Sequence, residues 1–197
     1  QLKNVVFIFS GSQQHLMSDL FTSPSRPFFR STAILPLGKI DKETYCEFIV
    51  SMFKNYKKEL DIEIAHEIYE WAQGHTFYVQ QLCNRVFSAS TKNVQPTVWK
   101  EQAHTLLKEQ EPVFFAFRNL LTQPQWQLLK AIAREGSVYK PTANDFLHEY
   151  QLGSSATVLR SLQALMRNEL VYTDVDDKGQ SYYGVYDVFL RRWAEAK

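Results

Sequence analysis

Two arginines in a proline-rich loop are the first residues whose type suggests chemistry. The loop "TSPSRPFFRS" covers residues 22–31 and holds Arg26 and Arg30. The planar guanidinium fork of arginine suits phosphate oxygens and can stabilise the charge that develops in phosphoryl transfer. The other interpretation is that both arginines are solvated loop charges. The loop therefore indicates either a phosphate contact or an ordinary surface.

A cluster of small polar residues precedes that loop. The apolar run "VVFIF" at 5–9 ends in Ser10 and Ser12, and Gln13 follows. A run that is apolar at every position predicts a central strand of a parallel sheet, here followed by a turn and a short helix over 13–21. The two serines could face a site at the end of the strand, or they could only cap the helix.

The nucleotide-binding signatures that would complete such a site are missing from this sequence. A P-loop requires G-x-x-x-x-G-K-[ST], and the Gly38-Lys39 pair has Ala33 five residues before it and Ile40 after it. No apolar strand ends in paired acids that could hold magnesium. The five histidines show no ligand spacing, so we expect no metal site. We also expect no ATP hydrolysis by this chain alone.

The elements around these residues predict a mainly α fold in three parts. Residues 1–40, with strands at 5–9 and 32–37, have the pattern of the end of an α/β unit. Residues 41–121 show apolar positions at helical spacing without intervening strands, which predicts an all-α subdomain. Its last two helices are expected over 96–108 and 112–121.

Residues 122–197 have the order helix, helix, turn, helix, hairpin, helix. This order predicts a winged helix-turn-helix domain. The third helix would be the recognition helix, and its candidates for contact with DNA or a partner are Ser154, Ser155, Thr157, Arg160 and Arg167. The domain carries nine Lys or Arg against nine Asp or Glu, whereas a DNA-binding surface should be basic. We therefore expect chiefly protein contact, and DNA binding stays open.

Composition limits the remaining classes. The net charge is +1, and no apolar run reaches the length of a membrane span, so we expect no membrane partner. Cys46 and Cys83 lie in helical patterns rather than in a disulfide framework. Buried free thiols favour a reducing compartment and predict a cytoplasmic protein.

Four motifs, in this order, resemble a known family. They are "VFIFSGSQQHLM", "SRPFFRSTAILPL", "GHTFYVQQLC" and "YDVFLRRW". Together they resemble the C-terminal part of the prokaryotic archaeal-ATPase-like proteins, which are P-loop ATPases of the AAA+ and STAND group. The likeness covers nearly the whole chain. It implies that residues 1–40 are a remnant of an α/β ATPase core with its sensor 1 strand, that 41–121 are a helical lid subdomain, and that 122–197 are the winged helix.

The resemblance also implies roles for single residues. The sensor tip would be Ser10, Ser12 or Gln13, the catalytic arginines would be Arg26 and Arg30, and the lid motif beside adenine would contain Gly74 and His75. Thr76 stands where that lid motif has proline.

ATP and magnesium would then be held by a P-loop core that precedes these residues, and none is expected on this chain. The intact protein would be a nucleotide-controlled switch. The alternatives are a non-enzymatic winged-helix DNA-binding regulator and an adaptor that binds only protein.

Overall fold

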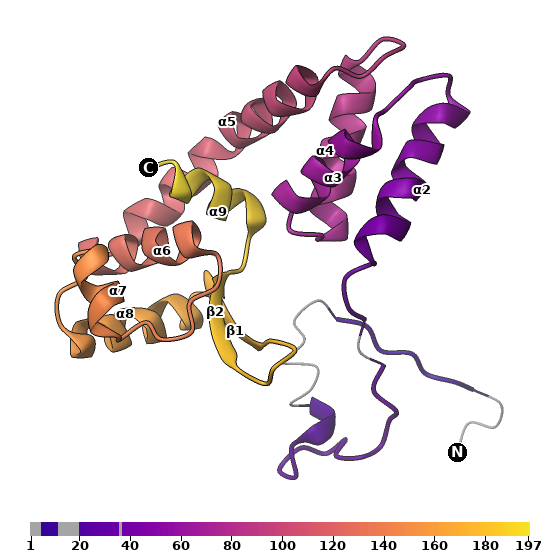
Figure 1. The fold of residues 1–197 in the computed structure, drawn as a ribbon. Helices are drawn as coiled ribbons and strands as arrows, with labels where there is room; N and C mark the ends of the chain where they lie inside the picture. The colour runs from indigo at the N-terminus through magenta and orange to yellow at the C-terminus, as the bar shows by residue number, and fades with distance from the viewer. Residues whose placement is uncertain (1–4, 12–19, 36) are drawn as a thin grey trace. The chain divides into compact units, whose positions relative to one another are not determined.

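The computed structural model describes residues 5–11, 20–35 and 37–197 (Figure 1). The chain divides into two compact units, 1–38 and 39–197, and each is considered by itself.

The first unit contains little regular structure among its described residues. Residues 20–22 are helical and 24–30 form turns, whereas 5–11 and 31–35 are irregular. The predicted strands at 5–9 and 32–37 are therefore wrong for the residues described. A strand must pair its backbone groups with a neighbouring strand, and no described segment pairs with either run. The apolar side chains are left exposed, with Val6 at 86% and Ile8 at 89%.

The second unit begins with four helices, as the periodicity predicts. They are α2 (Lys42–Asn55), α3 (Ile62–Trp71), α4 (Thr76–Ala89) and α5 (Pro96–Leu120). Asp41 caps α2 by accepting a hydrogen bond from the Thr44 amide (3.0 Å), and Asp61 caps α3 through the Glu63 amide (3.1 Å). Pro96 occupies the first turn of α5, where its missing N–H costs nothing.

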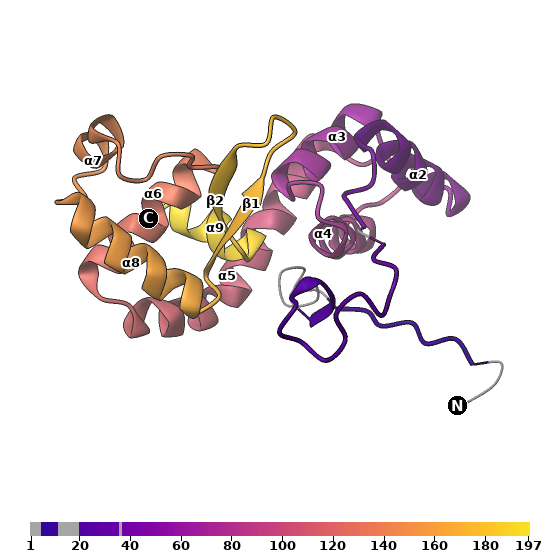
Figure 2. The same ribbon diagram turned by 90° about the horizontal axis from the view of Figure 1, so that it is seen from below.

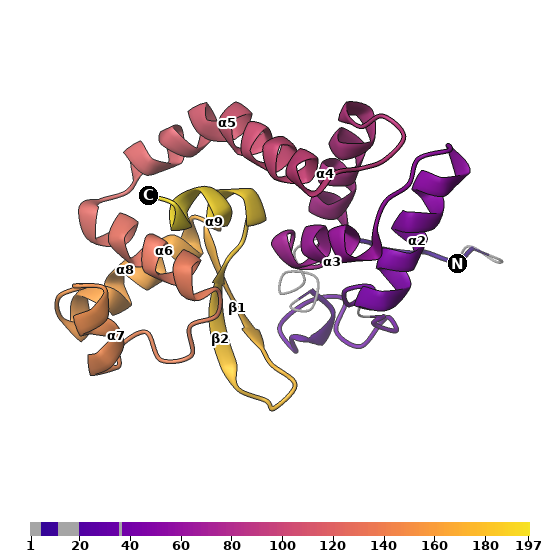
Figure 3. The same cartoon turned by 45° about the horizontal axis from the view of Figure 1, so that its top comes forward.

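The fourth helix differs from its prediction. Residues 96–120 form one helix of 25 residues, although Pro112 lies inside it. A proline removes one helical hydrogen bond and usually kinks or ends the helix. Here the turn that follows buries Phe114, which is 2% exposed and packs against the Trp193 ring at 5.5 Å. Tertiary packing offsets the local penalty, and α5 continues to the C-terminal domain (Figure 3).

The C-terminal elements follow the predicted order. They are α6 (Gln123–Glu135), α7 (Asn144–Glu149), α8 (Ser155–Arg167), β1 (Val171–Val175), β2 (Ser181–Val185) and α9 (Val188–Glu195). Thr122 and Gln125 form a capping box at α6, Ser154 caps α8, and Asp187 caps α9 through the Leu190 amide (2.8 Å).

A third segment joins the hairpin and was not predicted. Val138 and Tyr183 exchange two backbone hydrogen bonds of 2.9 Å, so the segment between α6 and α7 pairs with β2. On β2, Gly184 lies under the Tyr172 ring of the opposite strand, and a Cβ there would come within 2.9 Å of it. A larger residue at this position would displace the Tyr172 ring.

One hydrophobic core runs through the second unit. The fully buried side chains include Ile68 and Leu82 of the lid helices and Leu129, Leu165 and Leu190 of the winged helix domain. The last helix, α9, lies beside both α5 and α6 (Figure 3). The helices α2–α5 and the elements that follow them are therefore packed together rather than joined by a loose linker.

A leucine substitution tests the position of this core. Leu129→Ala removes a side chain with no exposed surface, and we expect the free energy of unfolding to fall by about 2–5 kcal/mol. Leu120→Ala makes the same change at a side chain that is 78% exposed, and it should cost less than about 0.5 kcal/mol. Chemical denaturation of both variants measures the difference. Equal losses would show that α6 does not face the core as described.

Candidate functional site

The two loop arginines lie on the surface of the first unit. Hydrogen bonds from the Arg26 amide to Ser23 O (3.0 Å) and from the Arg30 amide to Phe21 O (2.9 Å) shape the loop. Both side chains are exposed, and the Arg30 guanidinium lies 5.2 Å from the Phe29 ring centre. Ser10 is also exposed in this unit, whereas Ser12 and Gln13 lie outside the described residues.

Gly74 ends α3 in a Schellman motif. Its amide donates to Tyr69 O (2.8 Å), and the Gln73 amide donates to Glu70 O (3.0 Å). Both residues have positive φ, 66° for Gly74 and 55° for Gln73. The Tyr69 ring covers Gly74 so closely that a Cβ would lie 2.5 Å from its hydroxyl oxygen. Helix termination alone thus accounts for the glycine.

His75 follows directly and is the N-cap residue of α4 without a side-chain capping bond. Its ring lies 4.8 Å from the Tyr78 ring, edge to face. Desolvation, followed by the charge of Lys39, lowers the pKa of His75 below its ordinary value near 6.5. The imidazole is therefore neutral at pH 7. It can accept one hydrogen bond and stack, but it offers no positive charge to a phosphate.

The turn between α3 and α4 receives the last helix of the chain. Phe189 of α9 packs against the Trp71 ring at 5.7 Å and the Tyr78 ring at 4.6 Å. Arg192 donates from Nε to Trp71 O (2.9 Å) and from Nη2 to Glu70 O (3.3 Å). These carbonyls are among the last four of α3, which have no partner within the helix. The motif around Gly74 and the motif around Phe189 are therefore in direct contact.

A buried tyrosine strengthens this contact. Burial, and then the charge of Asp187, raise the pKa of the Tyr78 hydroxyl, so it stays protonated. Asp187 meanwhile caps α9 through the Leu190 amide. Asp187 thus caps the start of α9 and also lies close enough to Tyr78 of α4 to raise the pKa of its hydroxyl. Nothing in the sequence indicates this pairing, because Arg192 and Trp71 are 121 residues apart.

The predicted contact residues of the third helix lie together on α8. Ser154 caps the helix through the Thr157 amide (3.3 Å) and contacts the Thr157 hydroxyl (3.0 Å), so both have a structural role. Ser155, Arg160 and Arg167 are exposed. Arg160 donates to Ala156 O in its own helix (3.3 Å). Figure 2 shows α8 beside the hairpin β1–β2, which is the wing.

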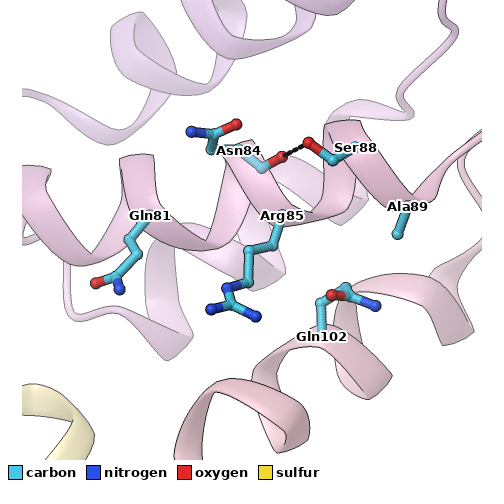
Figure 4. A pocket seen from close by; sticks show the side chains of 6 residues that line it. All are labelled: Gln81, Asn84, Arg85, Ser88, Ala89 and Gln102. Atoms are coloured by element: carbon cyan, nitrogen blue, oxygen red, sulfur yellow. Dashed lines mark hydrogen bonds between the residues drawn. The ribbon is translucent and has the colours of Figure 1, made fainter. Parts of the chain in front are cut away.

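An open hollow of about 570 Å³ lies between α4 and α5 (Figure 4). Its lining is mostly polar and consists of Gln81, Asn84, Arg85, Ser88, Ala89 and Gln102. Arg85 is paired with both carboxylate oxygens of Glu109, and Ser88 donates to Asn84 O (2.9 Å). The one strong cation of the hollow is thus already neutralised, and the hollow offers little to an anionic ligand.

Other chemistries find no support among the described residues. The two cysteines are free, and burial raises the thiol pKa of Cys46 to about 11 and that of Cys83 to about 12. Both are therefore unreactive thiols at pH 7. Within residues 5–11, 20–35 and 37–197, no three potential metal ligands are grouped. No helix in the described part of the chain combines the length and apolar character needed to cross a membrane.

Comparison with known proteins assigns the C-terminal domain. A family model described as "Probable winged helix domain" matches residues 112–196. This domain is a winged helix. The match begins at Pro112, inside α5 and ten residues before the predicted boundary at 122. No curated protein matches the sequence.

The whole fold is similar to a solved ATPase structure. A Walker-type ATPase of Pyrococcus abyssi superposes with a TM-score of 0.52 at 16% sequence identity, over 91% of this chain. This chain spans 49% of the length of that protein. At this identity the likeness concerns the fold alone.

A glycine pair tests the geometry of the α3–α4 turn. Gly74→Ala places a Cβ at φ 66° and against Tyr69, and we expect a loss of about 2–4 kcal/mol in the free energy of unfolding. Gly153→Ala has the same backbone strain at φ 77° but no atom within 4 Å, so it should cost about 1–2 kcal/mol. Equal losses in thermal or chemical denaturation would contradict the close packing of Tyr69 over Gly74.

Proposed function

We propose that this chain is the C-terminal region of an ATP-binding, archaeal-ATPase-like protein of the AAA+ and STAND group. Its lid and winged helix would act as a nucleotide-controlled switch and a protein-contact module. The family resemblance of the four motifs supports this proposal, as do the winged-helix match and the fold similarity to a Walker-type ATPase. The P-loop and the magnesium ligands would come from a core domain outside these residues.

The contact between α9 and the α3–α4 turn carries the proposal. Gly74 and His75 are the residues that the resemblance places beside adenine. Phe189 and Arg192 of the winged helix hold the end of α3 and the start of α4, only a few residues from that position. A nucleotide that shifted this turn would have to move or release α9. The switch thus needs no long pathway, because the turn proposed to lie beside adenine is itself in contact with α9.

The charge state of His75 suits the adenine side of a nucleotide. A neutral imidazole can accept a hydrogen bond from an exocyclic amino group or stack on the base. Phosphate recognition would then fall to Arg26, Arg30 and the sensor residue at Ser10, Ser12 or Gln13. This division assigns stacking and hydrogen bonding to the lid, and positive charge to the loop of the first unit.

The winged helix itself presents mixed charges. Arg160 and Arg167 on α8 favour the alternative function, a DNA-binding regulator. Against it, Asp174 and Asp177 are exposed on the adjoining wing, where a DNA-binding domain would approach the phosphates. Carboxylates beside the backbone repel it, so we favour contact with protein.

Hydrogen exchange on the full-length protein tests the switch. We expect ATP to change exchange at the amides of 189–195 by about fivefold or more, since typical coupling energies correspond to that range. Arg192→Ala should reduce this response and, because coupling between two equilibria is reciprocal, shift the ATP dissociation constant by a comparable factor. Arg134→Ala is the matched control, because its guanidinium reaches α9 only through Glu195 O at 3.4 Å. An ATP response confined to other residues would refute the switch.

Turnover of the full-length ATPase tests the loop arginines. If Arg26 or Arg30 contacts the transferred phosphate, its alanine variant should lower kcat about a thousandfold with little change in KM. Lys54→Ala, at the end of α2, should leave both parameters unchanged. Full turnover in both arginine variants would identify them as solvated loop charges.

A further inference from the structure

The winged helix carries two adjoining surfaces of opposite charge. The solvent face of α8 has Arg160 and Arg167, and its sequence "SATVLRSLQALMR" contains no acid. The wing has Asp174, Asp176 and Asp177 against Lys178. We call these the α8 face and the wing face.

Each face also exposes apolar surface beside its charges. On α8, Leu159 is 49% and Met166 is 36% exposed; these two share one strip of the helix, beside the strip that carries Arg160 and Arg167. On the wing, Val175 is 56% exposed, on the opposite side of the hairpin from Asp174. Tyr139, Tyr182 and Tyr172 form a row of ring contacts at 5.9 and 6.2 Å. Apolar surface flanked by charge is typical of a protein interface rather than of a purely solvated face.

The charges on these faces find few strong partners within the described chain. No ion pair joins Arg160, Arg167 or Asp177 to another described residue. Asp174 accepts from the Val175 amide (2.8 Å) and from the Tyr182 hydroxyl (3.4 Å). A partner could therefore gain ion pairs without breaking existing ones.

The two signs together restrict what can cover both faces. A nucleic acid would meet carboxylates at the wing, a uniformly acidic protein would be repelled there, and a uniformly basic protein would be repelled at α8. A suitable partner presents acids opposite α8 and bases opposite the wing. A second copy meets this requirement when a two-fold axis places the α8 face of each copy opposite the wing face of the other.

We propose that the winged helix is a homodimerisation module in which α8 of one copy pairs with the wing of the other. This deepens the proposed function, since it rests on the winged helix being a protein-contact module and names the partner as a second copy. The α8 helix of 13 residues is about 20 Å long, which suits an interface that also includes the hairpin. The two-fold symmetry would bring two ATPase chains together through their C-terminal ends.

Charge reversal on the whole chain tests the pairing. Sedimentation of the wild type should show a species of about twice the 23.0 kDa chain mass at micromolar concentration. Arg160→Glu with Arg167→Glu reverses the α8 face, and Asp174→Lys with Asp177→Lys reverses the wing face. Like charges would then oppose each other, so each doubly reversed protein should dimerise at least about tenfold more weakly.

Mixing the two reversed proteins gives the decisive measurement. Both contacts are again attractive in the mixed dimer, so a one-to-one complex should form although neither protein dimerises alone. This restoration shows that both variants are folded. Association through the exposed apolar run at 5–9 would not respond to these changes. Lys108→Glu, the same kind of reversal on an exposed lid residue, should leave the dimer unchanged.

Three outcomes overturn the proposal. A wild-type chain that stays monomeric at about 100 μM, or a dimer insensitive to both reversals, or a mixture that forms no complex would exclude this interface. Binding of the chain to a DNA duplex, measured at about 50 and 200 mM salt, separates the homodimer from the more general protein-contact role. A chain that stays monomeric and does not bind the duplex refutes only the homodimer. Tight binding with a steep salt dependence, lost in Arg160→Ala, refutes the protein-contact module as well.

Discussion

The arrangement of the second unit depends on how α9 docks. This helix has eight residues, which is too short to be stable in water by itself. Its helicity comes from burying Trp193 against α5 and α6, and Phe189 against Trp71 and Tyr78 at the α3–α4 turn. Arg192 then donates to the carbonyl of Trp71 at the end of α3, which has no partner within the helix, and adds a second donor to the Glu70 carbonyl. The helix α9 is thus stabilised by its contacts with the helices before it, and it in turn stabilises the end of α3.

The same dependence explains what could be predicted from the sequence and what could not. Helices such as α2, α3 and α8 follow from apolar positions at helical spacing and from local caps, which are all properties of neighbouring residues. The continuity of α5 through Pro112 was missed because the compensating contact, between Phe114 and Trp193, joins distant parts of the chain. The pairing of Val138 with Tyr183 was missed for the same reason. The apolar run at 5–9 is the opposite case, since its pattern indicates a strand but no described segment pairs with it.

The candidate site shows the same division. Gly74 was singled out by motif, and its positive φ and its bond to Tyr69 O account for the residue type locally. Its functional interest comes instead from what lies beside it, the contact of Trp71 and Tyr78 with Phe189, which no local pattern encodes. The loop arginines carry a signal in residue type alone, and their exposure is compatible with either interpretation.

The winged helix shows why fold and partner must be argued separately. Its helices and hairpin have the order of a DNA-binding domain, yet order fixes only where surfaces lie, and the side chains decide what they attract. Arginines on α8 next to aspartates on the wing create a local dipole instead of the uniform positive field that nucleic acid requires. Such a surface attracts acidic groups at α8 and basic groups at the wing, which favours a partner of definite shape and charge pattern. The winged helix is held to the α3–α4 turn through α9. A partner bound to α8 or to the wing and a change in that turn would therefore act on the same helix.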